Sequence, residues 1–128
     1  MIDKNFDDWN KVKKHTEEKS GPFFYEREVW FTKIGENIGF EQCGKNLNFA
    51  RPVLILKKFN NDIFWGIPLT KSDKDGNYYF KFILNEESST AILSQLKLVD
   101  GKRLMSKIGK IDKDNFNILK QKIRKLLE

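Results

Sequence analysis

A single arginine stands between a polar loop and an apolar run. Residues 39–58 read GFEQCGKNLNFARPVLILKK, so Arg51 comes directly before a proline and an unbroken hydrophobic stretch. A guanidinium group stays charged and presents a fork of N–H donors that matches phosphate and carboxylate oxygens. Arg51 is therefore a candidate for holding an anion. The alternative is an ordinary surface arginine at the end of a strand.

Thr70 is the residue that we expect beside Arg51. Segments 52–59 and 62–70 are rich in apolar residues and are joined by a short asparagine turn, so they are predicted to pair as an antiparallel hairpin. Counting back from the turn, position 51 faces roughly position 70. A guanidinium fork and a hydroxyl at the same end of the sheet would make a cradle for a phosphate group. Glu41, in the preceding loop, could fold back over the same point.

Several kinds of chemistry are excluded by what the chain lacks. Its one histidine, His15, cannot form a histidine acid–base pair within one chain, and it is read as a solvent-facing helix residue. Its one cysteine, Cys43, excludes an intrachain disulfide and a cysteine zinc site. No glycine-rich phosphate loop follows a strand and opens a helix. No His, Cys and carboxylate cluster has metal-ligand spacing. We therefore predict no cofactor and no metal site.

The positive charge is concentrated near the end of the chain. The 128 residues carry a net charge of +6, and residues 97–128 hold ten basic and four acidic groups. A basic block on a small domain suggests a polyanion as partner, although a solvated lysine-rich helix face gives the same pattern. No apolar run reaches the ~20 residues that a membrane span needs. The charged N-terminus has no signal-peptide core, so a cytoplasmic protein without membrane contact is expected.

The elements that must position these residues are mostly short strands. Turn signals separate them, including Asp75-Gly76, and short strands at this spacing favour a small barrel or curled sheet. Asp112 is predicted to cap a final helix whose apolar stripe is Phe116, Leu119, Ile123 and Leu126. The full prediction is a helix over 5–19, a strand over 27–34, a loop over 35–50, strands over 52–59, 62–70, 78–84 and 90–99 with a turn at 87–89, and the final helix.

Five short stretches carry a resemblance to a known family. In order from about residue 27 to residue 111 they are REVWF, IGFEQCG, RPVLIL, GIPLT and TAILSQLKLVDGKRLMSKIGKI. Together they resemble the PemK/MazF-type toxins, which are metal-independent endoribonucleases of toxin–antitoxin pairs. The resemblance implies an SH3-like barrel of about five to six short strands. On this reading residues 1–25 are an N-terminal helical extension, and residues 26–128 are the barrel domain with its C-terminal helix.

The resemblance also implies partners and site residues. It implies a homodimer, a cognate antitoxin that covers the groove, and single-stranded RNA, such as mRNA, as the substrate. The catalytic residues of the family fall on Arg51, Thr70 and Glu41. The SQLK segment lies along the expected RNA groove, and the loops over 35–50 and 71–78 are expected to read the bases. These placements predict RNA contacts by Gln42, Lys45, Lys71, Ser72, Gln95 and Lys97.

The chemistry of RNA cleavage fits these residue types. RNA carries its own nucleophile, the 2′-hydroxyl beside the scissile phosphate. Arg51 would neutralise charge on the phosphate oxygens, Thr70 would orient one oxygen, and Glu41 would be the base. The products would be a 2′,3′-cyclic phosphate and a 5′-hydroxyl end. Two alternatives stay open, since a fold does not fix a function: a catalytically silent barrel that binds nucleic acid, and a dimer that binds an acidic protein.

Overall fold

The computed structural model describes residues 21–34 and 50–128 of the chain. The predicted helix over 5–19 lies outside the described residues, and so does nearly all of the predicted loop over 35–50. The site candidates Glu41, Gln42 and Lys45 fall in that second gap. The division of the chain after residue 25 therefore stays a prediction.

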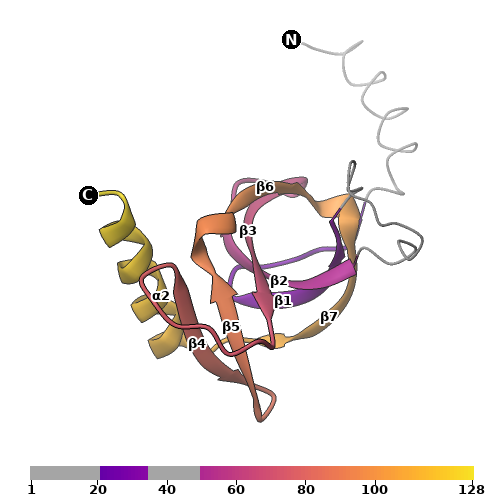
Figure 1. Ribbon diagram of the computed structural model, residues 1–128. Helices are drawn as coiled ribbons and strands as arrows, with labels where there is room; N and C mark the ends of the chain where they lie inside the picture. Colours follow the sequence, from indigo (N-terminus) through magenta and orange to yellow (C-terminus); the bar gives the residue numbers. More distant parts are fainter. Residues whose placement is uncertain (1–20, 35–49) are drawn as a thin grey trace, which may run out of the picture.

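The described residues form a curled antiparallel sheet with one long helix against it (Figure 1). The strand order is β4-β5-β3-β2-β1-β7, and β6 pairs with the first half of β3, from Ile63 to Gly66. The mainly β small barrel with a C-terminal helix is thus confirmed, with seven strands among the described residues. The elements are β1 (Glu28–Lys33), β2 (Ala50–Lys58), β3 (Ile63–Thr70), β4 (Tyr79–Leu84), β5 (Glu87–Ile92), the 3-10 turn η3 (Leu93–Gln95), β6 (Lys97–Asp100), the 3-10 turn η4 (Gly101–Arg103), β7 (Leu104–Lys110) and α2 (Lys113–Leu126).

The hairpin predicted between the two central strands is present. Asn60 forms the turn between β2 and β3, where its side-chain oxygen accepts hydrogen bonds from the N–H groups of Asp62 (2.7 Å) and Ile63 (3.0 Å). The local bonds of an asparagine side chain replace the backbone pairing that the turn interrupts. Gly76, in the next loop, has a positive φ of 124°, which is the conformation that favours glycine.

Two predictions between residues 87 and 99 are wrong. The turn lies at Asn85 and Glu86, both with positive φ, and not at 87–89, because β5 already begins at Glu87. Two consecutive positive φ values suit a two-residue hairpin, but a glutamate there carries no turn signal. The predicted strand over 90–99 is in fact two strands, because η3 separates β5 from β6. Residues 104–110, for which no strand was predicted, form β7.

The sheet buries apolar side chains on both of its faces, which explains the unbroken VLIL run of β2. Along that strand Leu54 and Leu56 belong to one buried cluster, while Val53 and Ile55 belong to another. The first cluster lies against α2 and the β4–β5 hairpin. The second fills the barrel itself and consists of Phe24, Trp30, Val53, Ile55, Phe64, Val99 and Leu104. Both faces are therefore dry, as in strands covered on two sides.

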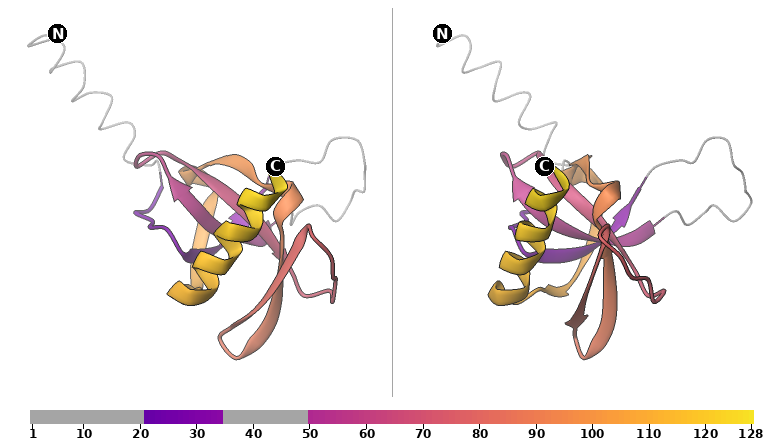
Figure 2. Two further views of the ribbon diagram at one scale, coloured as in Figure 1. Left: turned by 90° about the vertical axis from the view of Figure 1, so that its left-hand side faces the viewer. Right: turned by 60° about the vertical axis from the view of Figure 1, so that its left-hand side comes forward.

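Helix α2 forms as its sequence predicts. The carboxylate of Asp112 accepts a hydrogen bond from the N–H of Asn115 at 3.0 Å and caps the first turn. Phe116 and Leu119 are buried in the first cluster, and Ile123 and Leu126 pack against it. The helix runs alongside β4 in both views of Figure 2, on the outer side of the sheet.

A side-chain hydrogen bond from the β4–β5 hairpin connects the two ends of the curled sheet. Between β1 and β7 the register shifts, so Ile108 is an extra residue between the pairs Val29–Gly109 and Trp30–Lys107. The side-chain amide of Asn85, at the tip of the β4–β5 hairpin, donates to the Ile108 carbonyl at 2.9 Å. A bulge thus supplies the acceptor for the contact between the first and last strands of the sheet order.

Among the described residues, no helix is both long and apolar enough to cross a membrane.

Candidate anion site at the rim of the barrel

A row of polar residues crosses the sheet at one end of its central strands. Thr32 of β1 pairs with Arg51 of β2, and Thr70 of β3 pairs with Thr90 of β5. Between β2 and β3 the register pairs Val53 with Pro68. The same register carried two residues further sets Arg51 opposite Thr70, which is the pairing that the turn position predicts.

The side chains of this row point toward the second buried cluster, the one that fills the barrel. Successive side chains of a strand alternate between faces, so residues two apart share a face. Val53 and Val99 belong to that cluster, and therefore Arg51 and Lys97 lie on the same face at its edge. Gly66 shows that β3 follows the same pattern, because a Cβ there would lie 2.6 Å from the Val53 side chain. Thr70 is four residues further along β3 and shares this face.

Three cations gather at this edge of the barrel. Burial lowers the pKa of Lys97, and the positive charges of Arg103 and Arg51 lower it further. The mutual repulsion of like charges is relieved when an anion binds between them. Arg103 is also anchored at the end of β1, where its guanidinium donates to the Lys33 carbonyl at 3.4 Å. We call Arg51, Lys97 and Arg103 the rim cluster.

Arg103 is the member of the rim cluster that sequence reasoning missed. In the sequence it is one of many basic residues in the last quarter of the chain. Its position depends on η4, the 3-10 turn that follows β6, and on a contact with a residue 70 positions earlier. The sequence contains one hint, an Asp-Gly pair at residues 100–101, and in the structure Asp100 accepts from the N–H of Lys102 and so fixes this turn.

The two threonines nearest Arg51 differ in what they can offer a ligand. Thr32 is buried, and its hydroxyl donates to the Trp30 carbonyl at 2.9 Å, so its proton is already used. The hydroxyl oxygen of Thr70 accepts from the N–H of Ser72 at 3.1 Å. A hydroxyl that accepts in this way keeps its proton for donation. Thr70 can therefore donate to a phosphate oxygen, and it also orders the residue that was predicted to contact RNA beside it.

The loop between β3 and β4 is held by contacts from two sides. Lys81 lies within 3.0 Å of both Asp73 and Asp75, and these exposed carboxylates raise its pKa. Lys122 of α2 donates to the carbonyls of Gly76 (3.3 Å) and Tyr79 (2.8 Å). Exposed ion pairs contribute little stability one by one, but several contacts to one loop restrict its conformations. The predicted RNA-reading loop over 71–78 is thereby ordered.

Two further candidates, Lys71 and Gln95, are exposed at the ends of β3 and β5. Lys71 makes an ion pair with Glu87 at 2.6 Å, and the hydrogen bond and charge of that lysine lower the pKa of the carboxylate. Gln95 is exposed in η3, two residues before Lys97. In the parts of the chain that the structure describes, no group of three or more His, Cys, Asp or Glu residues is arranged to hold a metal ion.

Comparison with known proteins places this arrangement in a family. The family model of the PemK-like, MazF-like toxin of type II toxin–antitoxin systems matches residues 26–127. Among solved structures, the crystal structure of an Mtb toxin is similar with a TM-score of 0.54 and 18% sequence identity, over 59% of this chain and 91% of that chain. At this identity the likeness shows the fold alone. None of the curated proteins matches the chain. The chain belongs to the PemK-like, MazF-like family of toxins of type II toxin–antitoxin systems.

Proposed function

We propose that the protein is a metal-independent endoribonuclease toxin that cleaves single-stranded RNA at selected sequences. Membership in the family supports an endoribonuclease toxin in general terms. The observation that carries the finer proposal is the rim cluster, because three cations drawn together beside Thr70 form a site for the phosphodiester of an RNA strand. A 2′-hydroxyl is required in the substrate, so DNA resists cleavage.

The cleavage reaction needs charge stabilisation and two proton transfers. The 2′-oxygen attacks the adjacent phosphorus, the bond from phosphorus to the 5′-oxygen breaks, and a 2′,3′-cyclic phosphate and a 5′-hydroxyl end result. Arg51 neutralises the charge that builds on the non-bridging oxygens, and a donor fixed in this way commonly accounts for ~3 kcal/mol of barrier lowering. Thr70 orients one of these oxygens by donating its hydroxyl proton.

The proton transfers fall to groups with suitable pKa values. Arg51 stays protonated and is no base. In our proposal Glu41 takes the proton of the 2′-hydroxyl, which requires its carboxylate to come within ~3 Å of that oxygen. Lys97 is the candidate acid for the leaving 5′-oxygen, because its lowered pKa makes its proton easier to release. Arg103 adds charge at the rim without contacting the reacting atoms.

The partners follow from the same site. A cognate antitoxin is proposed to cover the rim cluster, since an acidic segment lying across three cations would exclude RNA by competition. The protein is proposed to act as a homodimer. The loops over 35–50 and 71–78 are proposed to select the RNA sequence, with Gln42, Lys45, Lys71, Ser72 and Gln95 as contacts. Recognition of single-stranded bases by such loops depends on stacking and on contacts to base edges.

The test is digestion of single-stranded RNA in the presence of EDTA, followed by analysis of the RNA ends. Arg51→Ala is expected to lower the cleavage rate by about 100-fold or more while the protein stays folded. Arg51→Lys keeps the charge but loses the fork and should recover only part of the rate. Lys113→Ala removes an exposed cation from the start of α2 and serves as the control.

Three results decide between the readings. Undiminished cleavage by folded Arg51→Ala protein refutes the role of Arg51. Cleavage that stops in EDTA and returns with a divalent cation refutes metal independence. RNA that binds in a salt-dependent way and stays whole supports the alternative, a barrel that binds nucleic acid without cutting it.

A further inference from the structure

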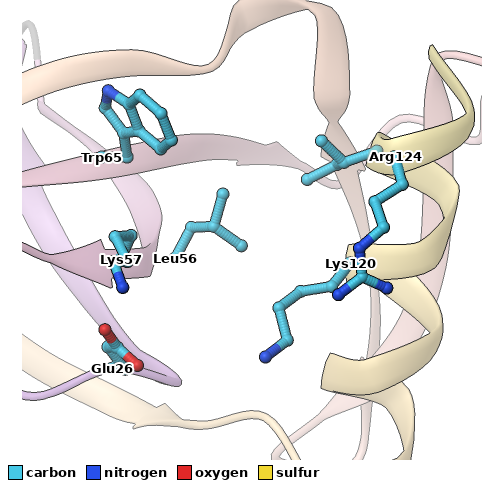
Figure 3. Close-up of a pocket in the computed structure, with 7 residues that line it drawn as sticks. Glu26, Leu56, Lys57, Trp65, Lys120 and Arg124 are labelled. Carbon is cyan, nitrogen blue, oxygen red and sulfur yellow. The ribbon is translucent and has the colours of Figure 1, made fainter. Parts of the chain in front are cut away.

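A pocket lies away from the rim, between α2 and the outer side of β2 and β3 (Figure 3). Its volume is about 270 Å³. Leu56 and Ile123 form its apolar lining, where the last turns of the helix meet the edge of the first buried cluster. Trp65 of β3 stands on the sheet side of the pocket. None of these side chains belongs to the site proposed for cleavage.

The aromatic side of this pocket is exposed and held in place. Trp65 is 42% exposed, which is high for a residue of its size, and its ring is not part of either buried cluster. Phe59 contacts it edge to face, with 5.1 Å between ring centroids and an angle of 88° between the planes. A tryptophan that is fixed in this way and open to solvent offers a flat surface on which another ring can stack.

The charged side of the pocket is strongly basic. Lys120 and Arg124 reach toward it from α2, and Lys57 reaches toward it from β2 (Figure 3). Among the described residues that line the pocket, Glu26 is the one carboxylate, and its Oε2 also accepts a hydrogen bond from the N–H of Lys58 at 2.9 Å. Three cations against one carboxylate leave a positive excess, which an anionic ligand would balance. Lys120 and Arg124 therefore belong to the basic block of residues 97–128 but not to the rim cluster.

We propose that this pocket is a second contact site for single-stranded nucleic acid and that it takes one nucleotide of the strand. The base stacks on Trp65, and the neighbouring phosphates contact Lys120 and Arg124. A stacking platform beside cations that follow the backbone is the general means of binding single strands without sequence preference. An amphipathic helix of a protein partner would need a longer row of apolar pockets than Leu56 and Ile123 provide.

The position of the pocket predicts a dependence on substrate length. Leu56 lies five residues along β2 from Arg51, or ~17 Å at the rise of a β-strand. The two residues also differ in the face of the strand that they occupy. An RNA that reaches both sites must pass from the rim onto the outer surface of the barrel. Only RNA that extends well beyond the cleaved bond is therefore bound more tightly because of the pocket. The contribution to cleavage rests on the proposed function, whereas binding of single strands does not.

Binding is measured first, with a probe that cannot be cleaved. The probe is a deoxythymidine oligonucleotide about 20 nucleotides long, which exceeds a typical single-strand site. Trp65→Ala and the double variant Lys120→Ala/Arg124→Ala are each expected to weaken binding about tenfold. The double variant should also make the salt dependence of log K shallower by about 1.4. Lys113→Ala/Lys125→Ala removes the same charge from the same helix outside the pocket and should stay within about twofold of wild type.

Cleavage is measured second, to separate this proposal from the proposed function. With RNA that spans only the cut site, the pocket variants are expected to match wild type, and with long RNA they should show a raised KM at unchanged kcat. If no RNA is ever cleaved but the pocket variants still weaken binding of the oligonucleotide, the pocket proposal stands and the nuclease proposal fails.

Three results would overturn the pocket proposal. The first is equal weakening by the pocket variants and by Lys113→Ala/Lys125→Ala, which would mean diffuse attraction by the helix. The second is fluorescence of Trp65, isolated by comparison with Trp65→Phe, that does not respond to the oligonucleotide. The third is a change of sedimentation in Trp65→Ala, which would place the pocket at an interface between protein chains.

Discussion

Glu28 is a buried carboxylate whose removal should destabilise the whole barrel. It is 5% exposed at the start of β1. Its Oε1 accepts hydrogen bonds from the Trp30 indole N–H at 3.0 Å and from the Tyr25 N–H at 2.9 Å, and its Oε2 lies 3.0 Å from the Lys107 ammonium. These contacts connect β1 to β7 and to the segment that precedes β1. Glu28 therefore joins β7, the last strand of the sheet order, to the neighbouring strand β1.

The cost of removal can be estimated from these contacts. Glu28→Ala leaves the buried indole N–H and the partly buried Tyr25 N–H without their acceptor. A donor left unpaired costs about 1–3 kcal/mol when buried and less where water can reach it. The ion pair with half-exposed Lys107 adds at most about 1 kcal/mol because solvent screens it. We expect a loss of about 3–5 kcal/mol in the free energy of unfolding. Glu28→Gln keeps an oxygen acceptor for both N–H groups and should cost only about 1 kcal/mol.

Urea and thermal unfolding at pH 7 measure both effects. At roughly 4 °C per kcal/mol for a domain of this size, Glu28→Ala should lower the Tm by about 15 °C and Glu28→Gln by about 4 °C. Glu87→Gln makes the same chemical change at an exposed ion pair and should leave the Tm unchanged. If Glu28→Ala is no less stable than Glu87→Gln, the hydrogen-bond network does not stabilise the fold and this reasoning is wrong.

The pH dependence gives a second check. Burial tends to raise the pKa of Glu28, but the hydrogen bonds from Trp30, Lys107 and Tyr25, together with the charge of Lys107, outweigh burial and lower it below the ordinary value of 4.5. Its contribution is therefore fully present above pH 4.5 and is lost as the pH falls through the lower, folded-state pKa. The stability difference between wild type and Glu28→Gln should shrink over that acidic range.

Two further predictions address the core and the rim. Leu119→Ala removes a fully buried side chain of α2 and should cost about 2–5 kcal/mol in urea unfolding, and a cost below 1 kcal/mol would contradict the packing of the helix on the sheet. Arg103→Ala removes one cation of the rim cluster and should make the salt dependence of log K for single-stranded RNA shallower by about 0.7 while raising the pKa of Lys97. A slope equal to that of wild type, measured beside Lys113→Ala, would exclude Arg103 from the RNA contact.

Local signals predicted much of the fold. The asparagine turn predicts the β2–β3 hairpin, and a turn centred between Asn60 and Asn61 sets Arg51 opposite Thr70. In the structure the pairs next to the turn are shifted by one residue, and the bulge between Ile55 and Lys57 restores the predicted alignment. Asp112 and the apolar stripe that follows it predict α2, because capping and burial both act within a few residues. These features can be predicted from the sequence because the residues that cause each of them lie within the segment that adopts it.

The features that were missed depend on distant contacts. Glu86 adopts a positive φ although it is no turn former, in a hairpin whose tip is fixed by the Asn85 contact with β7. The strand predicted over 90–99 has a continuous β-like pattern, and only pairing with β3 at both of its ends reveals the 3-10 turn between them. Arg103 reaches the rim through a contact with Lys33, which no local pattern shows.

The contact between Asn85 and the Ile108 carbonyl bears on how the molecule avoids sticking to copies of itself. A curled sheet that does not close fully keeps two border strands, and the unpaired backbone groups of such strands can recruit strands from other chains. In the described sheet β4 and β7 border the main strand order, and β6, which pairs only with β3, leaves a further free edge. The Asn85 amide and the Leu84 side chain bring the β4–β5 hairpin against β7. Loss of this contact would free the β4–β5 hairpin from β7, and we expect that to make both borders more accessible to strands from other chains.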